Sequence, residues 1–105
     1  NFMFSEAQKA VDDWVQNFKK PYWQPLSQLA RVSEEVGELA RLLNHQFGDK
    51  PKKETELQQE LGEEIADVLF ALICLANSQN VNLDEAFANV MEKAHSRDSD
   101  RYEKK

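Results

Sequence analysis

Apolar side chains recur three and four positions apart along most of this chain, which is the spacing of one face of an α-helix. The pattern predicts four helices, at residues 5–19, 26–47, 54–79 and 83–97. No stretch alternates between apolar and polar residues as a β-strand with one buried face does. The pattern therefore predicts an all-α fold.

The residues between these segments are of the kinds that end helices. Two prolines stand in KPYWQP at residues 20–25, and a third stands in the basic connector GDKPKK at residues 48–53. Asn82, with Glu85 three residues later, fits the N-cap of the last helix. Short connections favour antiparallel neighbours, so we expect one four-helix domain over residues 1–105, with a frayed tail from about residue 98.

The third predicted helix contains an unusual apolar run, VLFALICLA at residues 68–76. A helix that is apolar on all sides has to be covered on all sides. A chain of 105 residues is too small to do this alone, so we expect a second copy to cover the helix. The sequence therefore predicts at least a homodimer.

Carboxylates stand three and four positions apart on the second and third helices, which places them on shared helix faces. An acidic run on a helix is most often a solvated face, and like charges at this spacing cost only about 0.2–0.5 kcal/mol per pair. The residues concerned are Glu34, Glu35 and Glu38 on the second helix, and Glu60, Glu64 and Asp67 on the third.

The solvated-face interpretation fails for Glu64, because this residue fills a gap in the apolar stripe between Leu61 and Val68. A carboxylate there needs protonation, a basic partner or a metal to offset the cost of its burial. Arg31 and Arg41 could pair with acids of the second helix, but the third helix carries no Lys or Arg. We therefore favour a hard divalent cation such as Mg²⁺, held by carboxylate oxygens.

Composition narrows the classes of partner. The formal net charge of −6 does not favour docking on a nucleic-acid polymer, although an acidic site can meet anions through a metal. The single cysteine, Cys74, excludes an internal disulfide and favours a reducing, cytoplasmic setting. No apolar run has the length of a membrane span, so we expect no membrane partner.

The two acidic motifs, taken together, resemble the signature of a known family. EExxE at residues 34–38 followed by ExxD at residues 64–67 looks like the signature of the MazG-like nucleotide pyrophosphohydrolases, and the similarity extends over residues 22–97. The resemblance implies a four-helix unit that dimerises, often into a tetramer. It also implies Mg²⁺-dependent hydrolysis of a (deoxy)nucleoside triphosphate to the monophosphate and pyrophosphate, for example in nucleotide-pool house-cleaning.

The resemblance also assigns roles to the acids. Carried over by motif, the metal ligands are Glu35, Glu38, Glu64 and Asp67, and Glu34 is the candidate to orient or deprotonate the attacking water. Mg²⁺ is the expected cofactor, with Mn²⁺ as a substitute. A triphosphate is strongly anionic, so this acidic site would repel its substrate unless the metal is bound.

Basic residues are expected to meet the departing pyrophosphate. Lys93 and Arg97 stand four positions apart on the last helix, and the family tends to carry a Lys and a downstream Arg there. Lys53, in the basic connector, is a further candidate, and a solvated loop is an equally good interpretation of that cluster.

Aromatic residues near the first connection are candidates to hold the base. The resemblance implies that Tyr22 and Trp23 form part of a base pocket, where stacking on an aromatic side chain contributes about 1–3 kcal/mol. Packing in the core or at an interface is the alternative for Trp23 and is favoured for Trp14 and Phe18. Asn44 follows the acidic residues of the second helix and is a further candidate for contact with the nucleotide.

Two other functions fit part of this pattern. A non-enzymatic helical interaction module with a structural cation would also explain Glu64 in an apolar stripe. A phosphoribosyl-ATP pyrophosphohydrolase belongs to the same superfamily. The segments PYW and NHQFGDKPKK fit the MazG-like branch better, so a nucleoside triphosphate pyrophosphohydrolase is the favoured function.

Overall fold

The computed structural model describes residues 3–46, 54–98 and 100–105. Within these ranges the chain is helical and contains no β-strand, which confirms the all-α prediction. None of the described helices is both long enough and apolar enough to span a bilayer. The elements are α1 (Phe4–Val15), α2 (Pro25–Gln46), α3 (Glu54–Ser78), α4 (Leu83–Lys93) and a π-helical turn η1 (Ala94–Asp98).

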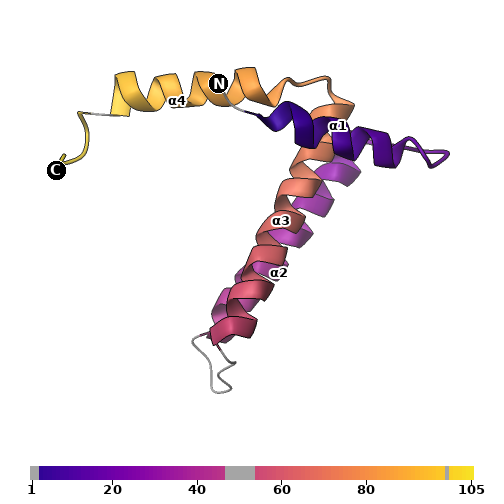
Figure 1. The fold of residues 1–105 in the computed structure, drawn as a ribbon, viewed down its shortest axis with the longest axis horizontal. Helices are drawn as coiled ribbons and strands as arrows, with labels where there is room; N and C mark the ends of the chain where they lie inside the picture. Colours follow the sequence, from indigo (N-terminus) through magenta and orange to yellow (C-terminus); the bar gives the residue numbers. More distant parts are fainter. Residues whose placement is uncertain (1–2, 47–53, 99) are drawn as a thin grey trace.

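The helices form a long arm and a crosspiece. Figure 1 shows α2 and α3 side by side and antiparallel, with α1 and α4 lying across the end of the pair where α3 finishes. Helix α1 packs against both α3 and α4. The far end of α4 points away from the arm, so the four helices do not close into a bundle within one chain.

Helix α1 ends at Val15, four residues earlier than the sequence pattern predicts. The side-chain amide of Asn17 donates to the carbonyl oxygen of Trp14 at 3.0 Å, in competition with the helical backbone pattern. Pro21 further disfavours a helical conformation at Lys20. Helix α2 then begins at Pro25. Proline is well tolerated at this first helical position, because its missing N–H would have no partner within the helix.

The connection from α3 to α4 is a tight turn. Asn80 has a positive φ of 56°, a conformation in which asparagine is one of the favoured residues. The side chain of Asn82 accepts a hydrogen bond from the backbone N–H of Glu85 at 3.2 Å. This confirms the predicted N-cap and fixes the direction in which α4 leaves the junction.

Gln8 of α1 ties the crosspiece together through its side chain. Its Nε2 donates to Asn77 Oδ1 at 2.9 Å and to the carbonyl oxygen of Val81 at 2.8 Å. Its Oε1 accepts from the backbone N–H of Leu83 at 3.0 Å. One carboxamide therefore links α1 to the end of α3 and to the start of α4.

Tyr22 anchors the loop between α1 and α2 to the same junction. Its hydroxyl donates to Asp12 Oδ1 at 2.6 Å and accepts from Asn77 Nδ2 at 3.1 Å. Burial, followed by the hydrogen bond to Asp12, raises the pKa of Tyr22 to about 12. The loop that carries Trp23 is therefore held at a defined place beside α3.

A buried glutamine sets α2 against α3. Gln28 is one of the most buried residues of α2, and its Nε2 donates to the carbonyl oxygen of Cys74 at 3.2 Å. Its Oε1 accepts from the hydroxyl of Ser78 at 2.7 Å. Both polar ends of this side chain are thus satisfied by α3, as burial requires.

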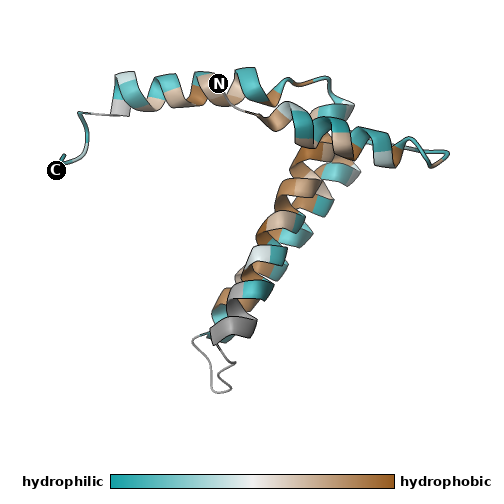
Figure 2. Ribbon diagram, viewed as in Figure 1, coloured by the Kyte–Doolittle hydropathy of each residue, from teal (hydrophilic) through white to brown (hydrophobic). Residues whose placement is uncertain are grey.

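The apolar residues of the arm are only partly covered. On α2 the buried positions are Gln28, Glu35 and Leu42, whereas the larger apolar side chains of Leu29, Val36 and Leu43 are exposed. Figure 2 shows apolar surface along much of the upper part of α3. The apolar run of α3 is half-exposed at several positions, so the described part of one chain does not cover it fully. The exposed residues are Leu29, Val36 and Leu43 on α2, and Ile65, Leu69, Phe70 and Leu72 on α3.

Candidate metal centre

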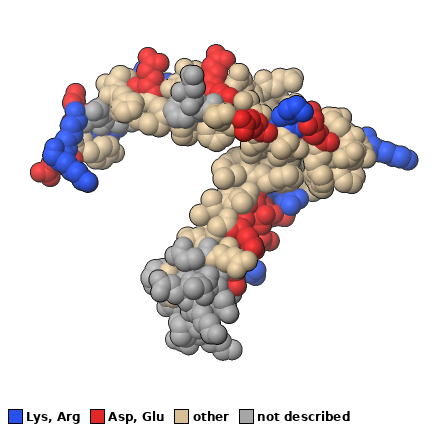
Figure 3. Space-filling view, in the orientation of Figure 1, with Lys and Arg blue, Asp and Glu red and all other residues tan. Residues whose placement is uncertain are grey.

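Three acids from the two arm helices converge on one point. Glu35 of α2 and Glu64 and Asp67 of α3 each offer a carboxylate oxygen, and these three atoms lie within 4.8 Å of one another. Glu64 and Asp67 are three residues apart and so share one face of α3. Figure 3 shows acidic side chains gathered partway along the arm. We call these three residues the acidic cluster.

The acidic cluster contains carboxylate oxygens that need a partner. Glu35 is only 8% exposed, and its Oε2 is buried without a hydrogen-bond partner. The Oε2 atom of Glu64 is buried and unpartnered as well. Buried carboxylate oxygens are normally paired or bound to a metal. Three converging oxygens from acids are the ligands that Mg²⁺ and other hard divalent cations prefer, so these residues fit such an ion.

The electrostatics of Glu64 lead to the same conclusion. Burial raises the pKa of Glu64 above its usual value of 4.5, and the negative charges of Glu38, Asp67 and Glu35 raise it further. Arg41 acts in the opposite direction. The site therefore favours a proton or a cation at Glu64 over the bare carboxylate.

Two of the predicted acidic residues stand outside the acidic cluster. Glu38 is exposed on α2, although it is near enough to act on the charge of Glu64. Glu34 is also exposed, and its charge stabilises the cationic form of Arg31. Their roles as a metal ligand and as the residue that orients the water stay predictions.

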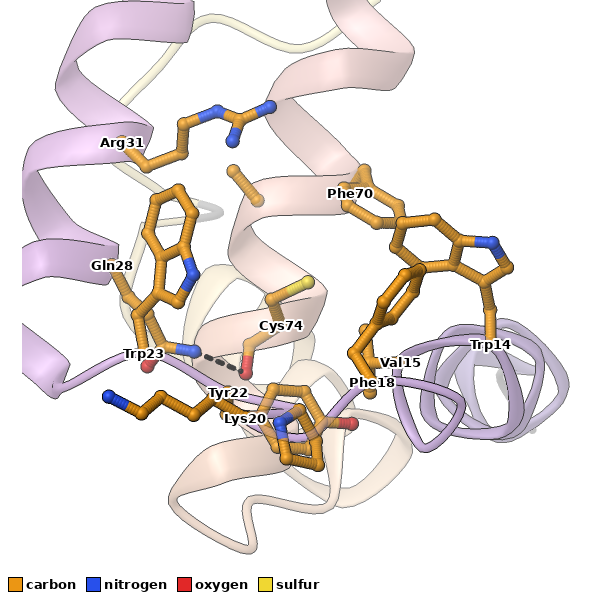
Figure 4. Close-up of a pocket in the computed structure, with 12 residues that line it drawn as sticks. Trp14, Val15, Phe18, Lys20, Tyr22, Trp23, Gln28, Arg31, Phe70 and Cys74 are labelled. Carbon is orange, nitrogen blue, oxygen red and sulfur yellow. Dashed lines mark hydrogen bonds between the residues drawn. The ribbon is translucent and has the colours of Figure 1, made fainter.

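An aromatic pocket of about 470 Å³ lies next to the acidic cluster. Figure 4 shows its walls, which come from α1, the loop after α1, α2 and α3. On α3 the pocket residues Ala71 and Cys74 continue the face that carries Asp67, at intervals of four and three. The remaining lining residues include Trp14, Phe18, Lys20, Tyr22, Trp23, Arg31 and Phe70.

Arg31 joins the pocket to the acidic cluster. Its guanidinium carbon lies 5.7 Å from the centroid of the Trp23 ring, and its Nε donates to Glu35 Oε1 at 2.9 Å. The hydrogen bond and charge of Glu35 raise the pKa of Arg31, so this side chain is always cationic. Helical spacing predicted that Arg31 could pair with an acid of this helix, but no local pattern predicted its contact with the pocket.

The structure places only some of the predicted base-contacting residues together. Tyr22 and Trp23 both line the aromatic pocket. Asn44 is exposed near the end of α2 and is not a lining residue. Trp14 and Phe18, which the sequence favoured as packing residues, line the pocket with their rings 5.0 Å apart. Their spacing of four residues was the only local signal that they act as a pair.

Two of the predicted phosphate contacts, Lys93 and Arg97, lie away from the acidic cluster within one chain. Lys93 is the last residue of α4 and Arg97 lies in η1, on the part of the crosspiece that points away from the arm (Figure 1). Lys53 lies outside the described residues. Contact between Lys93 or Arg97 and a phosphate at this cluster therefore requires an α4 from another molecule.

Comparison with known proteins gives the same assignment as the acidic motifs. Residues 24–102 match the MazG nucleotide pyrophosphohydrolase domain. YpjD, an uncharacterised protein of Bacillus subtilis (strain 168), is 50% identical over 100 residues, which are 95% of this chain and 90% of YpjD.

Solved structures of similar proteins have the same fold. A crystal structure of YPJD from Bacillus subtilis matches with a TM-score of 0.76 at 40% identity, over 92% of this chain and 99% of that one. A crystal structure of the Bacillus-conserved MazG protein, a nucleotide pyrophosphohydrolase, matches with a TM-score of 0.77 at 41% identity, over 95% of this chain and 97% of that one. This chain therefore belongs to the MazG nucleotide pyrophosphohydrolase family and is an enzyme of that class.

Proposed function

We propose that this protein hydrolyses nucleoside or deoxynucleoside triphosphates to the monophosphate and pyrophosphate, with Mg²⁺ as cofactor. The observation that carries the proposal is the continuity of the aromatic pocket with the acidic cluster along α2 and α3. A base in the pocket would direct its phosphates along the arm towards the cluster. Removal of unwanted nucleotides from a cytoplasmic pool is the physiological role that we attach to this activity.

The acidic cluster would hold the cation and the chain would position the reactants. Glu35, Glu64 and Asp67 supply converging oxygens, and the EExxE motif makes Glu38 our candidate for a fourth ligand. A divalent cation, when bound, neutralises phosphate charge and lowers the pKa of a coordinated water. Glu34 is our candidate to accept a proton from the attacking water. Positioning and charge neutralisation supply most of the acceleration in phosphoryl transfer.

We also propose that the enzyme acts as a homodimer or a dimer of dimers. Helix α3 leaves Leu69 and Leu72 half-exposed, and Leu29 and Val36 of α2 are similarly uncovered. A second copy is the occupant that explains this surface, and its α4 could bring Lys93 and Arg97 to the phosphates. Light scattering after size exclusion should give a dimer or larger species, and Leu69→Glu should shift it towards the monomer. A monomeric wild type would contradict this assembly.

The decisive experiment separates the products of hydrolysis. A panel of NTPs and dNTPs with Mg²⁺ should release pyrophosphate and the monophosphate, and a chelator should stop the reaction. Asp67→Asn and Glu38→Gln should abolish release without changing the oligomeric state. Glu63→Gln is the matched control, because Glu63 is an exposed neighbour of the cluster on α3. Orthophosphate as the main product, or full turnover by Asp67→Asn, would refute the proposed site.

The alternative interaction module makes a different prediction. It requires no turnover of any nucleotide in the panel, and cation binding that changes only stability or partner binding. A phosphoribosyl-ATP pyrophosphohydrolase would instead release pyrophosphate from that substrate alone. Including phosphoribosyl-ATP in the panel distinguishes the three functions in one assay.

A further inference from the structure

Arg31 contacts both a wall of the aromatic pocket and a residue of the acidic cluster. Its guanidinium lies over the ring of Trp23, at 5.7 Å from the ring centroid, on the pocket side (Figure 4). On the other side, its Nε donates to Glu35 Oε1 at 2.9 Å. A single side chain thus runs from the pocket wall to a residue of the acidic cluster.

The contact leaves the two oxygens of Glu35 in different states. Oε1 is occupied by Arg31, whereas Oε2 is buried and has no partner. A charge-assisted hydrogen bond to one oxygen restricts rotation of the carboxylate. Arg31 therefore restricts the orientation of the Glu35 carboxylate, which offers one oxygen to the cluster with Glu64 and Asp67.

Arg31 itself needs a partner to hold this position. Its side chain is partly exposed, so the ion pair with Glu35 competes with water and with rotamer freedom. The Trp23 ring covers one face of the guanidinium, and this type of contact adds stability even at exposed sites. Trp23 therefore restricts the position of the Arg31 guanidinium, and Arg31 in turn restricts the carboxylate of Glu35.

We propose that Arg31 is a positioning residue that couples the aromatic pocket to the cation site, with Trp23 as its support. The inference rests on the proposed cation site and adds a specific consequence. Trp23 should influence cation affinity although it touches none of the three acids. Because linkage is reciprocal, a cation at the acidic cluster should likewise change the affinity of the pocket for an aromatic ring.

Charge alone would produce a different result. Removing the cationic Arg31 would strengthen cation binding through simple electrostatics, whereas losing its positioning effect would weaken it. Arg31→Lys keeps the charge and removes the planar guanidinium, so it isolates positioning. Trp23→Leu changes no charge at all.

The test measures Mg²⁺ and Mn²⁺ binding by calorimetry without nucleotide. Trp23→Leu should weaken cation binding about 2- to 5-fold, and Trp23→Phe should restore it, because a ring face is again present. Arg31→Lys should weaken binding about 10-fold, as loss of a residue that orients a ligand does. Adding Trp23→Leu to Arg31→Lys should cause no further loss, because both act through one route.

Trp14→Leu is the matched control. Trp14 lines the same pocket with nearly the same exposure, 54% against 55% for Trp23, but the described contact with Arg31 is made by Trp23. Trp14→Leu should leave cation affinity at the wild-type value while weakening the binding of a nucleotide. Circular dichroism of each variant checks that the helices are intact.

The outcomes distinguish the two proposals. Cation binding by the wild type with an unchanged affinity in Trp23→Leu, or an equal loss in Trp14→Leu, would overturn the role of Arg31 and leave the cation site standing. A wild type that binds neither cation would overturn the site itself and this inference with it.

Discussion

The crosspiece depends on Gln8, and replacing it with methionine should measure how much. Gln8→Met keeps the length of the side chain and removes three hydrogen bonds, to Asn77, Val81 and Leu83. The bonds to Asn77 and Leu83 are partly buried, and each contributes about 0.5–1.5 kcal/mol. The bond to Val81 is exposed, so water can replace it at little cost.

The expected loss of unfolding free energy is therefore about 1–3 kcal/mol. For a domain of this size a loss of 2 kcal/mol lowers Tm by about 8–16 °C. Urea unfolding followed by circular dichroism, at one fixed protein concentration, gives the free energy directly.

Gln16→Met is the control for the Gln8 experiment, because Gln16 directly follows α1 and its side chain makes one exposed bond to Asp12 at 3.2 Å. Its replacement should cost less than about 0.5 kcal/mol. A similar loss in both variants would show that the change from glutamine to methionine itself, not the junction, is being measured. A loss below about 0.5 kcal/mol in Gln8→Met would refute the junction as a stabilising network.

Three further predictions concern titration and assembly. Because the folded pKa of Glu64 lies above 4.5, its contribution to stability is complete below pH 4.5 and is lost as pH rises through the folded value. Tm of the metal-free protein should therefore rise on acidification from pH 7 more in the wild type than in Glu64→Gln. Because the pKa of Tyr22 is about 12, an ultraviolet titration of the wild type should show a phenol that ionises at unusually high pH, and Tyr22→Phe should lack it. The contribution of Tyr22 to the free energy of unfolding should be lost as pH rises from 10 to 12. Finally, mixing inactive Asp67→Asn and Lys93→Ala chains should restore about a quarter of the wild-type sites if α4 acts on the partner's cluster. No recovery after subunit exchange would place Lys93 in its own chain's site or outside catalysis.

The helices and the acidic faces of α2 and α3 followed from local spacing, which is why the sequence predicted them. Glu64 stood out because a carboxylate interrupted an apolar stripe, and the structure places one of its oxygens among the buried, unpartnered atoms. Asn82, with Glu85 three residues later, predicted the N-cap of α4 from local spacing as well. Such features depend on residues a few positions apart.

Other features depend on which surfaces meet, and these the sequence could not predict. Leu29 and Val36 of α2 stand at helical spacing and both are exposed, whereas α2 buries Gln28 and Glu35. Apolar spacing alone does not tell a surface for the same chain from one for a second copy. The pocket combines Trp14 with Phe70, rings 5.9 Å apart from distant parts of the chain, so no local pattern could reveal it.

The two hydrogen bonds of Gln28 also select the alignment of the arm helices. Sliding α2 by one turn, about 5.4 Å, would separate this carboxamide from Cys74 and Ser78. The carboxamide would then be buried without hydrogen-bond partners, which is unfavourable. Only one axial alignment of the two helices therefore avoids that penalty. It is the alignment that puts Glu35 opposite Glu64 and Asp67. The uncharged amide of Gln28, two turns away, therefore selects the helix alignment in which the three acids converge.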